Sequence, residues 1–497
     1  MKKIMATLLA VTLTISCMVG CGKKSENGSV KNDDFTTLRI MYPSVNGAQK
    51  DVEEVQNALN VLLKDKLNCA IELDAPEMGT YAQRLPLALQ ANEDVAIAWA
   101  NFPIILQNVN KNAFAPLDDL LKSNGKELAK VFEDGFLDKV KINEKIYAIP
   151  VNKEFCAGSA NYFDKEIAER NGIDVKSLKT ALDYDKAFEK IKKNEPGITP
   201  LWSSKEQAIF SMESTNPEYP KYEEVFGISW MLIDPKTDKV QGIYDTIEPE
   251  PYEYMKKWVD EGVTNADTAT TSVGRYKAAS AGKTWMISGS SKPGYAAEAS
   301  ADLGREFIQG YAAQPKMSIA SMLGSAAVIP VGCKNKEKAM ELLQLIYTDK
   351  EVLNLLQFGI EGKHYVKNAD GMLELPPGVA TKSDSGYNPG INWIIGNQYN
   401  NYLWKGEDPQ KWEKFKEFNK EAVLDKSNGF VCDTSKYKNE IAVITSEYQT
   451  AYQMLAMGTS SDVKDSIARM KETMLKYKAD EVVQEVQRQY DEFLKTK

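Results

Sequence analysis

The chain has 497 residues, with 61 Lys and Arg side chains against 70 Asp and Glu side chains, and a formal net charge of −9. This acidic balance argues against a nucleic-acid-binding protein, which needs clustered basic side chains. The length exceeds what one hydrophobic core usually serves, so we expect two lobes and a monomer that is large enough to fold alone.

The first twenty residues have the three parts of a targeting segment. Lys2 and Lys3 give a positive start, an apolar run follows from residue 4 to about residue 15, and Met18-Val19-Gly20-Cys21 resembles a lipoprotein cleavage box. The run is shorter than the roughly 18 residues that a spanning helix needs. We therefore expect a signal peptide at residues 1–20 and lipidation of Cys21, with acyl chains as the only membrane attachment.

The residues after Cys21 are almost without apolar side chains, so residues 21–36 are predicted to be a flexible tether. The predicted location is the extracellular face of the cell membrane, because the lipid holds the chain there and no later segment reaches a spanning length. The remaining chain is expected to fold outside the membrane.

Strands and helices are predicted to alternate after the tether. The predicted strands are residues 37–42, 69–73 and 94–99, and the predicted helices include one with Val52, Val55, Leu59 and Leu62 on one face and another at residues 81–91. This alternation is typical of an open, mostly parallel sheet, which binds ligands at the carboxyl ends of its strands. Trp99 and Asn101 stand at such an end.

Later segments predict a second lobe and a return to the first. Residues 147–150 form a short strand that leads into a crossing, a second α/β segment covers about 160–285, and an apolar strand at 322–331 precedes a helix. Two helical stripes, at residues 463–474 and 482–493, make the C-terminal region helical, with Ser460 as N-cap of the former. The expected division is a first lobe of 37–150 plus about 290–350, and a second lobe of 151–289 plus about 351–497.

Most catalytic arrangements are missing from the sequence. The single His364 excludes His-rich metal sites and leaves one imidazole for any catalytic pair. The phosphate-loop-like Gly282-Lys283-Thr284 lacks the required earlier glycine, since Lys277 stands there. We predict no catalytic residues, no metal and no cofactor. A pair of carboxylates, as a glycosidase uses, stays open.

The cysteines do not suggest a metal site. Those outside the targeting segment and Cys21 are far apart and include no CxxC spacing. We expect free, buried thiols at Cys69, Cys156, Cys333 and Cys432.

Aromatic side chains beside polar ones are frequent. Sugars have an apolar C–H face and a rim of hydroxyls, which an aromatic ring with neighbouring amides matches. Trp230 and Trp258 are expected to pack in a core, and Trp412 to anchor a surface helix. The candidates are Trp99 near Asn101, Tyr162 after Asn161, Trp202 beside Ser203, Trp285 before Ser288, and Trp393 between Asn392 and Asn397.

The sequence resembles the family-1 extracellular solute-binding lipoproteins of Gram-positive bacteria, specifically the LplA/LipO-like subgroup, nearly from end to end. The resemblance is carried by residues 117–121 (LDDLL), 146–150 (IYAIP), 194–200 (NEPGITP), 359–366 (GIEGKHYV) and, most specifically, 385–418. It implies an α/β, two-lobed, periplasmic-binding-protein-like fold with open, mostly parallel sheets in both lobes, hinge crossings and a helical C-terminal segment. The ligand would lie between the lobes and close them by hinge motion.

The resemblance also implies a set of ligand contacts. Amides and Glu154 would bind hydroxyls, whereas Trp99, Tyr162, Trp285 and Trp393 would stack on sugar rings. Trp285 stands where relatives usually have a small residue, so it is either a platform or core. The implied contacts, with the turn at residues 288–292, are Trp99, Asn101, Glu154, Ser290, Lys292, Trp393, Asn397 and Gln398, to which Tyr162, Trp202 and Trp285 are added as aromatic candidates.

Three functions remain open at the level of sequence. The first is capture of an oligosaccharide for the permease subunits of an ABC importer, without chemistry on the sugar. The second is a glycan-processing enzyme with two carboxylates in the cleft. The third is a surface sensor or adhesin with the same fold.

Overall fold

The structure is a computed structural model that describes residues 35–156, 158–204 and 221–497. The predicted signal peptide, Cys21 and nearly all of the predicted tether lie outside these ranges. Within them, no helix is both long and apolar enough to cross a membrane.

A five-stranded sheet forms the first part of the fold. Its order is β2-β1-β3-β12-β4. β1 pairs in parallel with β2 and β3, whereas β12 runs antiparallel to both β3 and β4, so four of the five strands point the same way. The mostly parallel arrangement predicted for this sheet is confirmed. The strands are β1 (Thr36–Met41), β2 (Cys69–Asp74), β3 (Ile97–Ala100), β4 (Ala148–Pro150) and β12 (Ala326–Val328).

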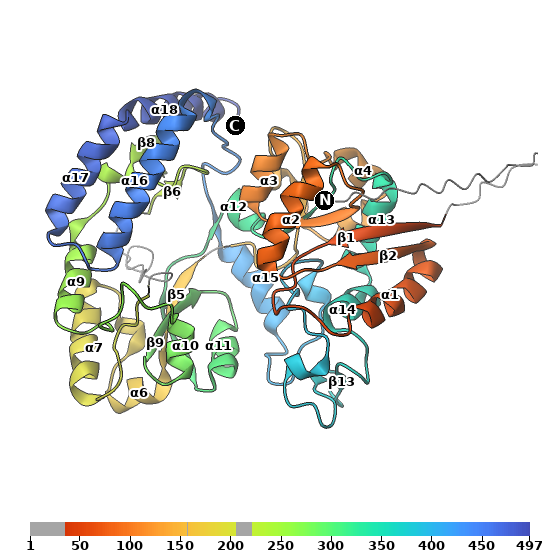
Figure 1. Cartoon of the computed structure of the whole chain (residues 1–497), viewed down its shortest axis with the longest axis horizontal. Helices are drawn as coiled ribbons and strands as arrows, with labels where there is room; N and C mark the ends of the chain where they lie inside the picture. The colour runs from red at the N-terminus through yellow and green to blue at the C-terminus, as the bar shows by residue number, and fades with distance from the viewer. Residues whose placement is uncertain (1–34, 157, 205–220) are drawn as a thin grey trace, which may run out of the picture. The chain divides into compact units, whose positions relative to one another are not determined.

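Helices cover this sheet and share one core with it. On α1 (Val52–Leu67), Val55, Leu59 and Leu63 are buried, and the helix packs against β2 and α14 (Figure 1). Asn68 ends α1 in the left-handed conformation, with φ 49°. The other helical segments here are α2 (Met78–Gln90), α3 (Phe102–Val109), α4 (Asp118–Ser123), α5 (Lys126–Ala129), η1 (Leu137–Val140), α12 (Ile319–Met322), α13 (Lys336–Thr348) and α14 (Lys350–Phe358).

A second sheet has the order β10-β5-β9 and is antiparallel throughout. The prediction of a mostly parallel sheet in this part of the chain is wrong. β9 (Met286–Ser290) and β10 (Phe307–Ala312) flank β5 (Ser159–Asp164) and are joined through α11 (Tyr295–Leu303), so they run parallel to each other with the earlier strand inserted between them. The covering helical segments are α6 (Lys165–Arg170), η2 (Val175–Ser177), α7 (Ala181–Asn194), α9 (Pro249–Asp260) and α10 (Arg275–Ser280).

A third group combines a small sheet with the C-terminal helices. β6 (Glu223–Glu224), β7 (Met231–Asp234) and β8 (Lys239–Gly242), followed by η3 (Ile243–Asp245), share a core around Trp230 with η6 (Ser435–Tyr437), α16 (Lys438–Ala456), α17 (Val463–Lys476) and α18 (Ala479–Leu494). α18 lies along β8 (Figure 1). The two predicted C-terminal helices, α17 and α18, are confirmed, but the N-cap of α17 is not Ser460. Asp462 caps α17, because its carboxylate accepts a hydrogen bond from the Asp465 backbone N–H.

Short elements connect these groups. β11 (Lys316–Met317) pairs in parallel with β15 (Val423–Leu424), directly after α15 (Lys411–Glu421). The remaining elements are β13 (Val366–Lys367), β14 (Leu373–Glu374), η4 (Lys382–Ser385) and η5 (Gln398–Asn400). The contacts group two segments differently from the expected division: β10 pairs with β5, and apolar side chains of 352–395 pack in the core of the first sheet.

Candidate functional site

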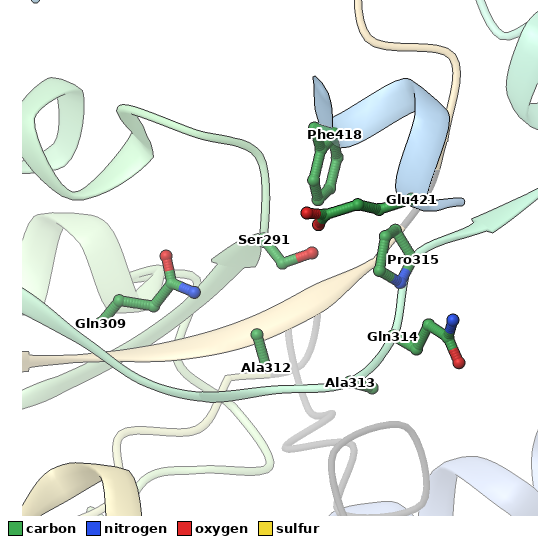
Figure 2. A pocket seen from close by; sticks show the side chains of 8 residues that line it. All are labelled: Ser291, Gln309, Ala312, Ala313, Gln314, Pro315, Phe418 and Glu421. Atoms are coloured by element: carbon green, nitrogen blue, oxygen red, sulfur yellow. The ribbon is translucent and has the colours of Figure 1, made fainter. Parts of the chain in front are cut away.

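A pocket of about 480 Å³ lies where the second sheet ends next to α15 (Figure 2). Its volume falls within the roughly 300–1,000 Å³ that small-molecule sites have. The wall combines one aromatic ring, one carboxylate, two carboxamides and one hydroxyl with small apolar groups. The residues are Ser291, Gln309, Ala312, Ala313, Gln314, Pro315, Phe418 and Glu421.

Three strand ends build one side of this pocket. Ser290 pairs with Ser159, and Ala312 pairs with Ala160, so the end of β9, the start of β5 and the end of β10 meet at one edge of the sheet. The register of β10 shifts between Gln309 and Ala312. Such a bulge re-aims side chains, and here it brings the chain from Gln309 along the floor of the pocket (Figure 2).

The Ser291 hydroxyl has no hydrogen-bond partner among the described residues, although the residue is only 7% exposed. Gly158 makes room for it, because a Cβ there would stand 2.2 Å from Ser291 Oγ. In Figure 2 the hydroxyl points toward the space beneath Phe418. A buried polar group without a partner is costly, so this hydroxyl is suited to an incoming hydrogen-bonding group.

Tyr162 orients the neighbouring carboxamide. Its hydroxyl donates to the Ser290 carbonyl oxygen at 2.6 Å, and the same hydroxyl oxygen lies 3.3 Å from Gln309 Oε1. This contact leaves the Gln309 NH₂ group on the side of the pocket, as Figure 2 shows. Tyr162 thus acts behind the pocket wall. Burial raises the pKa of its phenol, so the group is a neutral donor.

The opposite side of the pocket is the last turn of α15, which carries Phe418 and Glu421. Asn419 holds this turn in place: its Oδ1 accepts from the Phe155 backbone N–H at 2.7 Å, and its Nδ2 donates to the Lys153 carbonyl oxygen at 2.9 Å. Positions 418 and 421 share a face because they are three residues apart on a helix. The ring and the carboxylate are therefore presented together.

An ion-pair network holds the first turn of α15. Glu298 on α11 accepts from Lys292 at 2.9 Å and from Lys411 at 3.0 Å, and Lys411 also pairs with Glu407 at 2.6 Å. Burial disfavours the charge of Glu298, but the two lysines outweigh burial and lower the pKa of its carboxyl group. The predicted site residue Lys292 is thereby engaged in positioning α15, and its Nζ lies 5.9 Å from the centre of the Phe415 ring.

A separate aromatic pair lies at the carboxyl end of β3. The rings of Trp99 and Trp393 meet edge to face, with centroids 6.4 Å apart. Trp99 is buried and donates from Nε1 to Ser325 Oγ at 2.7 Å, whereas Trp393 is 37% exposed. Both residues were predicted ligand contacts, and the structure brings them together. Neither ring lines the pocket of about 480 Å³.

The other predicted polar contacts mostly support the backbone. The Asn101 side chain caps α3 by accepting from the Ile104 N–H. Asn397 accepts from Asn152 Nδ2 at 3.1 Å and donates to the Tyr347 carbonyl oxygen at 3.3 Å. Gln398 donates to the Asn392 carbonyl oxygen at 2.8 Å, in the turn that presents Trp393.

Glu154 is the exception among these polar residues. Its Oε1 pairs with Lys153 Nζ at 3.0 Å, but its Oε2 is buried and has no partner among the described residues. Tyr399 lies beside it, and its hydroxyl donates to the Lys153 carbonyl oxygen at 3.1 Å. Burial, together with the negative charge of Glu154, raises the pKa of the Tyr399 phenol.

Three predicted aromatic contacts have packing roles instead. Tyr162 and Trp285 have no exposed surface, so the expectation that their rings stack on a ligand is replaced by core packing. Trp285 was expected to be either a ligand platform or a core residue, and it is a core residue that packs against Phe163. Trp202 is half-buried and donates from Nε1 to the Val273 carbonyl oxygen at 2.7 Å. Trp230 and Trp258 pack in cores as predicted.

Sequence reasoning missed Gln309, Gln314, Phe418 and Glu421. Residues 309–315 (QGYAAQP) place two glutamines within one extended segment, and 418 and 421 have helical spacing, so both signals were present. What the sequence did not reveal is that the two segments are neighbours in space. Of the predicted turn at 288–292, Ser291 lines the pocket, and Ser290 fixes Tyr162 next to it.

His364 has the structural role that was predicted for it. His364 is buried, accepts from the Ile360 N–H through Nδ1 and lies 3.2 Å from Asp51 Oδ2 through Nε2. Burial lowers its pKa, against the opposing influence of Asp51. Among the described residues, no group of three or more His, Cys, Asp and Glu side chains is placed to hold a metal ion. Among the described residues Cys69, Cys156, Cys333 and Cys432 are free thiols; the first three are buried as expected, whereas Cys432 is only partly buried, so the expectation of burial is wrong there.

Comparison with known proteins defines the class. The family described as bacterial extracellular solute-binding protein matches residues 62–362, more than half of the chain, and the chain belongs to this family. Its members are extracellular binding proteins of ABC importers and not enzymes. A domain of unknown function, DUF3502, matches residues 426–495, which contain the C-terminal helices.

Individual relatives cover nearly the whole chain. A carbohydrate ABC transporter substrate-binding protein of Streptococcus pneumoniae serotype 4 is 25% identical over 100% of this chain and 99% of its own. The crystal structure of an N-glycan transport solute binding protein from Streptococcus pneumoniae has a TM-score of 0.79 at 22% identity, over 93% of this chain and 99% of that one. Its complex with Man5GlcNAc has a TM-score of 0.70 at 24% identity, over 93% and 99%. The structures confirm the α/β solute-binding fold.

Proposed function

We propose that the protein captures an oligosaccharide and delivers it to the permease subunits of an ABC importer. The observation that carries the proposal is the pocket beside α15, which sets the Phe418 ring against the unpartnered Ser291 hydroxyl and the Gln309 and Gln314 carboxamides. A ring face for C–H groups and several donors and acceptors for hydroxyls are what a sugar requires. The names of the relatives support a carbohydrate ligand.

A second contact surface is proposed at the Trp99–Trp393 pair. The exposed face of Trp393 is free to stack on another sugar of the same chain, while Trp99 holds it from behind. Glu154, whose Oε2 is unpartnered, is proposed to accept from a hydroxyl. Asn101, Asn397 and Gln398 are proposed to position these groups rather than to lead in ligand contact.

The proposed lobes follow the sheets. The first comprises residues 36–150 with about 318–404, and the second comprises about 158–312, with the C-terminal helices packed on β6, β7 and β8. Residues 151–156, 313–317 and 422–425 would be the crossings. Closure about these crossings would bring the Trp393 surface and the α15 pocket onto one ligand.

The membrane attachment is proposed from the sequence. Residues 1–20 would be removed as a signal peptide, Cys21 would carry acyl chains, and the tether that holds a monomer to the extracellular face of the membrane would end at residue 35 instead of 36, because Thr36 belongs to β1. Membership of the LplA/LipO-like subgroup is proposed on the segments that carry the resemblance, above all residues 385–418.

The test is a thermal-shift screen of residues 22–497 against neutral oligosaccharides, including mannose oligosaccharides that end in N-acetylglucosamine. A rise in melting temperature with one class, together with recovery of that glycan at unchanged mass, supports the proposal. Absence of any rise would contradict oligosaccharide capture and favour the sensor or adhesin alternative. Replacing Ser291 by Ala should reduce the shift, whereas replacing the adjacent Ser290 by Ala should leave it, because only the Ser291 hydroxyl lines the pocket.

A further inference from the structure

The pocket wall carries one formal charge, and it is negative. Glu421 is the one formally charged side chain among the lining residues. Within the part of the chain that the structure describes, no Lys, Arg or His forms an ion pair with it. Its charge therefore faces the pocket without an internal counter-charge.

Three lysines adjacent in sequence to Ser291, Glu154 and Glu421 are engaged in ion pairs. Lys292 pairs with Glu298 at 2.9 Å, Lys153 pairs with Glu154 at 3.0 Å, and Lys420 on the same helix pairs with Glu417 at 2.9 Å. Glu154 does not line the pocket, but both Glu154 and Glu421 act on Cys156, where burial and these two charges, opposed by Lys153, raise the pKa of the thiol. Lys316, which follows the lining residue Pro315, donates to the Tyr222 carbonyl oxygen at 3.4 Å and is not among the lining residues, so the one formal charge on the wall is that of Glu421.

Independent evidence that a ligand enters this space comes from Ser291. Its hydroxyl is more than nine-tenths buried, unpartnered and directed toward the same space (Figure 2). The pocket therefore offers hydrogen bonds to an uncharged group and repels an anion. Because closure of the lobes would remove water, the repulsion grows in the bound state.

We propose that Glu421 makes the pocket selective for uncharged sugars, so that oligosaccharides carrying a carboxylate, such as uronic acids, are rejected. This inference rests on the proposed function and names the ligand class of the same site. A carboxylate on the sugar would lie against the Glu421 carboxylate, and juxtaposed like charges suppress wrong ligands. A neutral hydroxymethyl group at the same position instead donates to Glu421.

The experiment uses a mannose oligosaccharide and the same oligosaccharide after oxidation of its C6 hydroxymethyl groups to carboxylates. Titration calorimetry on the protein should give a dissociation constant about 10-fold or more lower for the neutral glycan. The ratio of the dissociation constant of the oxidised glycan to that of the neutral glycan should shrink by roughly 3–10-fold in Glu421→Gln. In Glu421→Lys the oxidised glycan should bind more tightly than the neutral one. Glu417→Gln is the matched control, since Glu417 lies one turn earlier on α15, pairs with Lys420 and does not line the pocket; this variant should keep the wild-type ratio of the two dissociation constants.

The outcomes separate this inference from the proposed function. If wild type binds the neutral glycan but binds the oxidised glycan equally well, the charge selection is overturned and oligosaccharide capture stands. The same holds if Glu421→Gln keeps the wild-type ratio. If wild type binds neither glycan, capture of this glycan class fails, and the inference fails with it. A ratio that falls with added salt in wild type, but not in Glu421→Gln, supports an electrostatic origin.

Discussion

The indole rings of Trp99 and Trp393 meet at 90° with centroids 6.4 Å apart, although Trp99 lies in the third strand and Trp393 in the last third of the chain. Trp99 is buried and bonded to Ser325, while Trp393 keeps 37% of its surface exposed. An exposed tryptophan held rigid by a buried one is well suited to stack on a sugar, since little side-chain freedom is lost on binding.

Replacing Trp393 by Ala should weaken oligosaccharide binding by roughly 1–3 kcal/mol, because the stacking surface is lost. The melting temperature of the empty protein should stay nearly unchanged, since the ring is largely outside the core. Replacing Trp99 by Ala should instead cost about 3–5 kcal/mol of unfolding free energy. Calorimetry for binding and chemical denaturation for stability give the two readouts. A strong loss of stability in Trp393→Ala would place its ring in the core and refute the proposed surface.

Replacing Ser291 by Ala should weaken binding by about 0.5–1.5 kcal/mol through the loss of one hydrogen bond. The empty protein should be as stable as wild type or slightly more stable, because the hydroxyl is buried without a partner. Ser290→Ala is the control, since its hydroxyl accepts only from the Lys292 N–H. Equal losses of affinity in both variants would contradict a specific role for Ser291.

Replacing Glu298 by Gln should destabilise the protein at neutral pH by roughly 1–2 kcal/mol, because Lys292 and Lys411 both lose their charged partner. Its folded-state pKa is lowered from 4.5, so the contribution is present above 4.5 and disappears as the pH falls through the folded-state pKa. Denaturation of wild type and variant from pH 7 to pH 3 should show the difference shrinking. A difference that is constant across this range would exclude an ionic origin.

Asp425 should give the stability of the protein the opposite dependence on pH. Burial, with Glu223 and Glu224 adding to it and Lys316 opposing, raises its pKa from 3.8 to about 6. The folded protein therefore binds the proton more tightly than the unfolded chain, and stability falls as the pH rises from about 4 to about 6. As the pH rises through this window, Asp425→Asn should become more stable relative to wild type, because the asparagine side chain does not ionise. Parallel stability curves for the two proteins would contradict the raised pKa.

The first sheet was predictable because its strands are short apolar runs and its helices have one apolar face. Val55 and Leu59 followed the pattern, and α17 and α18 did so at the other end of the chain. Direction within the second sheet was not predictable, because β5 takes its partners from residues more than a hundred positions later. Strand polarity follows from that long-range pairing and leaves no local trace.

The residues of the candidate site were also only partly predictable from the sequence. Trp393 and the turn around Ser290 could be proposed from the sequence because an aromatic ring or a polar turn stands out locally, but Tyr162 and Trp285 have similar surroundings in sequence and are core. Burial depends on what the rest of the chain places over a ring. Glu421 was hidden for the converse reason, since one carboxylate in the charged segment KWEKFKEFNKE differs from its neighbours only by the face on which it lies.

α15 is tied at both ends: Lys411 in its first turn binds Glu298 of α11, and Asn419 in its last turn binds the backbone of Lys153 and Phe155. An eleven-residue helix is a rod about 16 Å long. A ligand that moves Phe418 must therefore also move residues 153–155 or strain the bond at Glu298. Occupancy of the pocket would thus be transmitted through α15 to the ion pair with Glu298 at one end of the helix and to residues 153–155 at the other.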